Sequence, residues 1–117
     1  MNLYAEHPEL QIGPLAFLVA APLAALGDAA QPLALILMTA AGPLCLALIA
    51  PLVPQWHRVR RVFLAGLVLM PAWTVLSVRF GHLDDVLALV LAVVALRAVV
   101  ANRAAFAGLA LGAAVAA

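Results

Sequence analysis

The stretch Leu33–Val53 reads LALILMTAAGPLCLALIAPLV and holds no charged residue in 21 positions. As an α-helix it rises about 31 Å, at about 1.5 Å per residue, which matches the hydrocarbon core of a bilayer at about 30 Å. A run of this length and composition is typical of a transmembrane helix. We therefore interpret the rest of the chain with lipid as its solvent.

The composition of the whole chain points the same way. Of its 117 residues, 68% are hydrophobic and 9% are charged, and the mean hydropathy is +1.20. Soluble domains are roughly 45–50% apolar and about 25% charged, so a soluble chain of this kind would expose apolar patches that drive association. The net charge of +1 argues against nucleic acid as a partner. The single cysteine, Cys45, excludes an internal disulfide and any multi-cysteine metal site.

Four apolar segments separated by short polar connections predict four transmembrane helices and a short C-terminal helical piece, in a single all-α domain over residues 1–117. Leu and Ala dominate these segments, and both favour helices. Backbone groups inside lipid must be paired within the protein, which helices achieve. The terminal piece is too short to span, so we expect it to be partial, interfacial or packed on a partner. The predicted spans are 10–27, 33–53, 62–80 and 85–101, and the terminal helix is 104–117.

Arginines indicate which side of the membrane each connection faces. Three of the six fall within four positions, in the sequence VPQWHRVRR of residues 53–61, and we expect residues 55–61 to be a connection. Cytoplasmic connections gather Arg and Lys, so this one predicts an integral protein of a bacterial inner (plasma) membrane with a cytoplasmic N-terminus. Asp28, Asp84 and Asp85 then fall outside. The predicted topology determinants, which can also contact lipid headgroups, are Arg58, Arg60, Arg61, Arg97 and Arg103.

Other charged residues have a structural and a functional interpretation. Arg97 lies near the predicted inner end of its span, which favours a side chain reaching the headgroups over a buried functional cation. Asp84 and Asp85 precede an apolar run, where we expect them to cap the helix and complement its dipole. Neighbouring residues on a helix point about 100° apart, so the two carboxylates are poorly placed to chelate one ion alone. We predict no metal site and no catalytic residue, although three histidines fall in connections: His7, His57 and His82.

The third predicted span carries a polar face, and hydroxyl-bearing Thr39 in the second span adds to it. Such residues can line a permeation path or hold a polar ligand atom. We favour helix packing, because contacts between helices in lipid use small residues and hydroxyls bonded to carbonyls. Pro43 and Pro71 are expected to kink the two helices. The candidate pathway or ligand face consists of Thr39, Trp73, Thr74 and Ser77.

The terminal piece has a regular pattern of small residues, spaced every fourth position and including a GxxxG motif. Such a flat ridge lets another helix approach closely. The sequence leaves open whether that helix belongs to this chain, a second copy or another protein. The predicted helix-packing ridge consists of Ala104, Gly108, Gly112 and Ala116.

Resemblances to known families are confined to short motifs. Pro54–Gln55 at a helix end resembles the PQ-loop transporters, and LAGLVLMPA (64–72) with VALRAVVANR (94–103) resembles the small subunit of branched-chain amino acid exporters. The first predicted span lacks the acid that small multidrug exporters carry there. The sequence therefore assigns the chain to no family, and no residue's role is carried over.

No set of reactive side chains converges on one side of the predicted membrane, so we predict a protein that is not an enzyme. We expect a noncatalytic small integral membrane subunit, or an assembly or stabilising factor of a larger membrane complex. The alternative is a small homo-oligomeric membrane transporter or channel. The expected partners are the lipid bilayer and other membrane subunits or copies of the chain. No cofactor is predicted, and a bound lipid, quinone or pigment beside Trp73 is compatible with the sequence.

Overall fold

The computed structural model describes residues 13–75, 77 and 82–117, and each element in this part of the chain is a helix. The predicted all-α fold class is confirmed. Parts of two predicted spans, residues 10–12 and residues 76 and 78–80, lie outside the described residues. The elements are α2 (Pro14–Ala24), η1 (Gly27–Ala29), α3 (Ala30–Ile49), η2 (Ala50–Leu52), α4 (Gln55–Val75), α5 (Leu83–Val100) and α6 (Ala104–Val115), where η denotes a short 3₁₀ turn.

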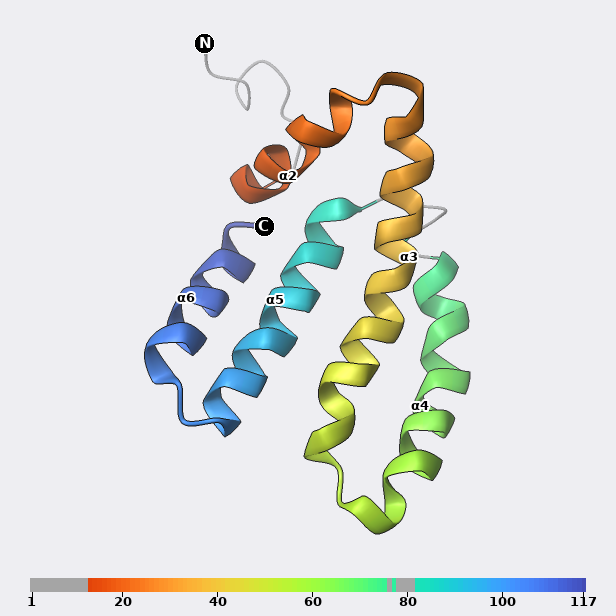
Figure 1. The fold of residues 1–117 in the computed structure, drawn as a ribbon, viewed down its shortest axis with the longest axis vertical. Helices are drawn as coiled ribbons and strands as arrows, with labels where there is room; N and C mark the ends of the chain where they lie inside the picture. The colour runs from red at the N-terminus through yellow and green to blue at the C-terminus, as the bar shows by residue number, and fades with distance from the viewer. Residues whose placement is uncertain (1–12, 76, 78–81) are drawn as a thin grey trace.

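The four helices α3 to α6 run side by side along the long axis of a flat bundle that measures 54 × 33 × 24 Å (Figure 1). Across the bundle their order is α6, α5, α3, α4, with α3 and α5 pointing one way and α4 and α6 the other (Figure 1). Helix α2 lies near the end at which α3 begins, and it meets the C-terminus, because the Leu15 N–H donates to the Ala116 carbonyl at 2.9 Å. The connections α3–α4 and α5–α6 therefore lie at the same end.

The core is small and lies where α3, α4 and α5 meet. Met38, Ala41 and Val86 are buried together, and Trp73 packs against them from α4. The Trp73 indole N–H donates to the Met38 carbonyl at 3.0 Å. A Cβ on Gly42 would lie 2.5 Å from Cδ1 of Trp73, so only glycine leaves room for the indole against α3. This contact links two helices that each continue through an internal proline.

By length and composition, one described stretch can cross a membrane: Gly27–Leu52, which has 26 residues and a mean hydropathy of 2.4. The structure therefore supports one of the four predicted spans. Helices α2 and α6 have only 11 and 12 residues. Helix α4 falls short because three arginines lie in its first two turns. Helix α5 falls short because it has two aspartates in its first turn and Arg97 in its last. A signal sequence and the core helix of a soluble protein share the length and composition of Gly27–Leu52.

The basic cluster lies in a helix, and the expectation that residues 55–61 form a connection is wrong. Helix α4 begins at Gln55, directly after Pro54, and the His57 N–H donates to the Pro54 carbonyl at 3.1 Å. Proline is well tolerated just before or at the start of a helix, and arginine is a good helix former. The apolar pattern that begins at Val62 marked the start of the predicted span, and it missed these first polar turns because they carry no apolar signal.

Candidate functional site

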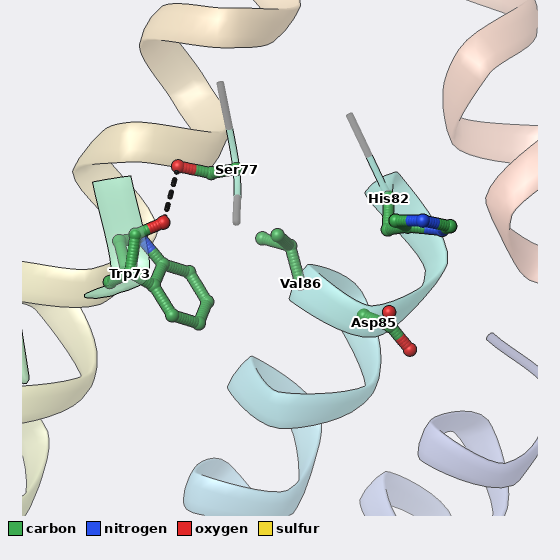
Figure 2. A pocket seen from close by; sticks show the side chains of 5 residues that line it. All are labelled: Trp73, Ser77, His82, Asp85 and Val86. Atoms are coloured by element: carbon green, nitrogen blue, oxygen red, sulfur yellow. Dashed lines mark hydrogen bonds between the residues drawn. The ribbon is translucent and has the colours of Figure 1, made fainter. Parts of the chain in front are cut away.

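A small cavity of about 70 Å³ lies between the C-terminal part of α4 and the first turns of α5. Figure 2 shows the five residues that line it, with Val86 of α5 lying between the indole of Trp73 and the polar pair His82 and Asp85 in this view. A few water molecules fit such a volume, whereas pockets for organic ligands usually hold about 300–1,000 Å³. The fifth lining residue is Ser77.

The Ser77 hydroxyl is buried, with 2% of the residue exposed, and it bonds to carbonyls in the last turn of α4. It donates to the Trp73 carbonyl at 2.9 Å and lies 3.4 Å from the Thr74 carbonyl. Figure 2 shows the hydroxyl turned toward Trp73 and away from His82. A nucleophile must contact its base at about 2.6–3.2 Å, so Ser77 and His82 do not form such a pair in this arrangement.

His82, Asp84 and Asp85 gather at the first turn of α5. One candidate ligand atom from each lies within 4.8 Å of the others, and His82 Nδ1 is 3.9 Å from Asp84 Oδ1. The cap of α5 is His82, without a side-chain cap hydrogen bond, so neither aspartate is the cap residue. Both carboxylates lie in the first turn, where they complement the positive end of the helix dipole as expected.

This cluster offers one nitrogen and two oxygen ligands, a set that divalent metal ions accept. The same positive helix end that favours the two carboxylates opposes a cation placed beside them. His82 and Asp85 are exposed and Asp84 is half-buried, so water screens all three groups. The geometry therefore favours stabilisation of the start of α5 by Asp84 and Asp85.

The structure brings together two of the four residues of the candidate pathway face. Trp73 and Ser77 line the small cavity, while Thr39 lines a shallow hollow on α3 with Pro43. Thr74 is exposed, and its hydroxyl donates to the Met70 carbonyl at 2.9 Å. The donor groups of Trp73 and Thr74 on α4, and of Ser77 just after it, are thus each bonded to a backbone carbonyl.

Two of the predicted topology determinants donate hydrogen bonds to backbone carbonyls in the last turn of α3 or just after it. The half-buried Arg97 donates from Nη1 to the Leu48 carbonyl at 3.1 Å, which joins the last turns of α5 and α3. Arg58 donates from Nε to the Val53 carbonyl at 3.2 Å and from Nη2 to the Pro51 carbonyl at 3.4 Å. Cations near the last carbonyls of a helix are favourable because they satisfy these groups and complement the dipole. Three further arginines at this end are exposed: Arg60, Arg61 and Arg103.

The predicted ridge of α6 points away from the bundle. The buried residues of α6 are Ala107 and Ala110, which lie on the opposite side of the helix from Gly108 and Gly112. A Cβ added at either glycine meets no atom within 4 Å. The outermost members of the ridge are Ala104, which is exposed, and Ala116, which is half-buried. Within the described residues, no helix therefore covers Gly108 or Gly112, whereas Ala116 at the end of the ridge contacts the start of α2.

Two contacts of this region were not predicted from the sequence. The fit of Trp73 over Gly42 has a partial signal in the Gly42–Pro43 pair, since a glycine inside a helix often marks a close approach. The bond from Arg97 to Leu48 has none, because the two residues are 49 positions apart. That His82 and Asp85 line the same cavity follows from their three-residue spacing at the start of a helix.

Comparison of the chain with protein-family models, with curated proteins and with solved structures finds no match in any of the three.

Proposed function

We propose that the chain is a noncatalytic small integral membrane subunit, or an assembly or stabilising factor, of a larger membrane complex. The observation that carries this proposal is the ridge of α6, which has the composition of a helix–helix contact and faces open space in the single chain. The arginine-bearing end of the bundle faces the cytoplasm in this proposal. Helix α2, the described start of the chain, lies at the opposite end.

The membrane location is supported by the exposure of apolar side chains. Helix α4 has no buried residue, and its Phe63, Leu67 and Val68 are 66%, 64% and 71% exposed. Only 22% of the most apolar window of Gly27–Leu52 is buried, whereas the core helix of a soluble protein is mostly buried. Lipid or protein partners must cover this much apolar surface, because water would drive the chains to associate. We propose that α3 to α6 lie within the bilayer, with their charged turns at its two surfaces.

The noncatalytic role is supported by the polar groups of the cavity beside Trp73. The buried hydroxyl of Ser77 is bonded to carbonyls in the last turn of α4, and the carboxylates of α5 stabilise a helix end. The cavity of about 70 Å³ leaves little room for a substrate. These contacts account for the polar groups that line the cavity without a bound substrate or cofactor.

The test uses Gly108 to separate partner binding from folding. Tagged protein is extracted from native membranes in mild detergent, and the proteins that accompany it are identified by mass spectrometry. Gly108→Leu fills the ridge, and since nothing lies within 4 Å of this position, the single chain accommodates it. An overpacked contact costs about 1–3 kcal/mol, so we expect Gly108→Leu to lower the recovery of the partner about tenfold or more.

Gly108→Ala is the matched control, because it keeps a small residue at the same position. Wild type and Gly108→Ala should retain the same integral membrane partner or second copy in a fixed ratio. A wild-type chain that emerges only as an isolated monomer at every concentration would overturn the proposal. Equal recovery of the partner with Gly108→Leu would show that the ridge is not the contact.

A further inference from the structure

A second, larger groove runs along α3 between α4 and α5 and has a volume of about 280 Å³. Its lining is apolar and spans Gly42 to Ile49 on α3, which is about 10 Å of helix length. The one lining residue with a side-chain N–H is Trp73, and that N–H is bonded to the Met38 carbonyl. The part of a ligand that fits this groove is therefore a hydrocarbon chain.

On α5, the groove-lining face leads directly to a cation. Leu89 and Val93 line the groove, and Arg97 follows one helical turn later on the same face. The bond from Arg97 to the Leu48 carbonyl places the guanidinium beside Ile49, the last residue of α3 in the groove.

On α4, the groove-lining face also leads to a cation. Arg58, Val62, Gly66 and Met70 recur every fourth residue, and Met70 lines the groove. The Cβ of a residue at position 66 would lie 3.4 Å from the Leu46 side chain, which confirms that this face of α4 is turned toward the groove-lining face of α3.

Both guanidinium groups bond to carbonyls in the last turn of α3 or just after it. The carbonyls that they contact belong to residues 48–53, and neither arginine pairs with a carboxylate among the described residues. An arginine has five N–H donors, and the bonds to carbonyls use two on Arg58 and one on Arg97. The remaining donors suit the planar, bidentate recognition of a phosphate group.

We propose that this groove binds one acyl chain of an anionic phospholipid, whose phosphate group is held by Arg58 and Arg97. The hydrocarbon lies between α3, α4 and α5, and the headgroup lies at the arginine-bearing end. This inference rests on the proposed membrane location, and it adds a specific lipid as a component of the folded protein.

Native mass spectrometry tests the proposal on the purified full chain. The protein is mixed with equal amounts of phosphatidylglycerol and phosphatidylcholine that carry the same acyl chains. Both lipids carry a phosphate, and phosphatidylcholine adds a positive choline group that the arginines repel. We expect one phosphatidylglycerol to be retained in preference by about tenfold, an effect the size of one charge-assisted contact. Arg97→Gln and Arg58→Gln should each bring the ratio of the two lipids close to one.

Arg103→Gln is the matched control, since it removes one positive charge from the same end without touching the groove. It should leave the preference unchanged. Ala72→Leu, at an exposed position that lines the groove, should lower the retention of both lipids equally because it narrows the space for the acyl chain. Thermal unfolding without lipid checks that each variant folds.

Three results would overturn the inference: equal retention of the two lipids by the wild type, an equal effect of Arg103→Gln and Arg97→Gln, or a lipid-free dimer in which a second copy covers the groove. A flotation assay with liposomes separates this failure from that of the proposed function. A chain that does not float with liposomes contradicts the membrane location, whereas a chain that floats without a lipid preference contradicts only the groove site.

Discussion

Two glycine-containing helix faces of this bundle differ in what they meet. Gly42 of α3 lies beneath the indole of Trp73, where an added Cβ would overlap the ring. Gly108 of α6 also lies within a helix, and a Cβ added there would meet no atom within 4 Å. Both faces suit a close helix contact. A small-residue face is therefore equally visible in the sequence whether its partner is inside the chain or outside it.

The same substitution, glycine to alanine, should give the largest difference in stability between these two faces. Gly42→Ala forces the indole away from α3 and breaks its bond to the Met38 carbonyl, and overpacking of this kind costs about 1–3 kcal/mol. Gly108→Ala meets no neighbour, so it should gain up to about 1 kcal/mol from helix propensity alone. Thermal unfolding of both variants in one detergent measures the difference. Equal unfolding temperatures would show that the indole does not fill the space above Gly42.

A smaller effect is expected when the indole is changed while the glycine stays. Trp73→Phe keeps an aromatic ring over Gly42 and removes the N–H that reaches the Met38 carbonyl at 3.0 Å. The loss should be about 1 kcal/mol, the usual net contribution of one hydrogen bond. Trp56→Phe is the matched control, because Trp56 is 83% exposed. Chemical unfolding monitored by circular dichroism compares the two, and similar losses would contradict the importance of the Met38 contact.

The helical fold and the terminal helix were predictable because they follow from local composition. Ala and Leu favour helices everywhere in the chain, and the pattern from Ala104 onward corresponds to α6 with little shift. The start of α4 was missed, since the turns that carry Arg58 are polar and only Pro54 marks their beginning. Long-range contacts such as Arg97 with Leu48 depend on how helices pack, which no periodicity in a single sequence specifies.

Of the candidate pathway residues, the structure groups Trp73 with Ser77 and leaves Thr39 in a separate hollow. The sequence shows that these residues are polar, and only the packing of α3, α4 and α5 shows which of them share a cavity. Hydroxyls in a helix bond readily to a carbonyl three or four residues earlier, and that general tendency accounts for both Thr74 and Ser77.

The smallest expected effect concerns these hydroxyls. Ser77→Ala removes a bond to the Trp73 carbonyl worth about 1 kcal/mol, and the better helix propensity of alanine offsets about half of that. Thr74→Ala, at an exposed position, should change the free energy of unfolding even less. If the chain is a subunit rather than a transporter, the double variant should retain the partner that accompanies the wild type. Ion or solute flux in liposomes that the wild type supports and the double variant loses would instead favour a pathway lined by Thr74 and Ser77.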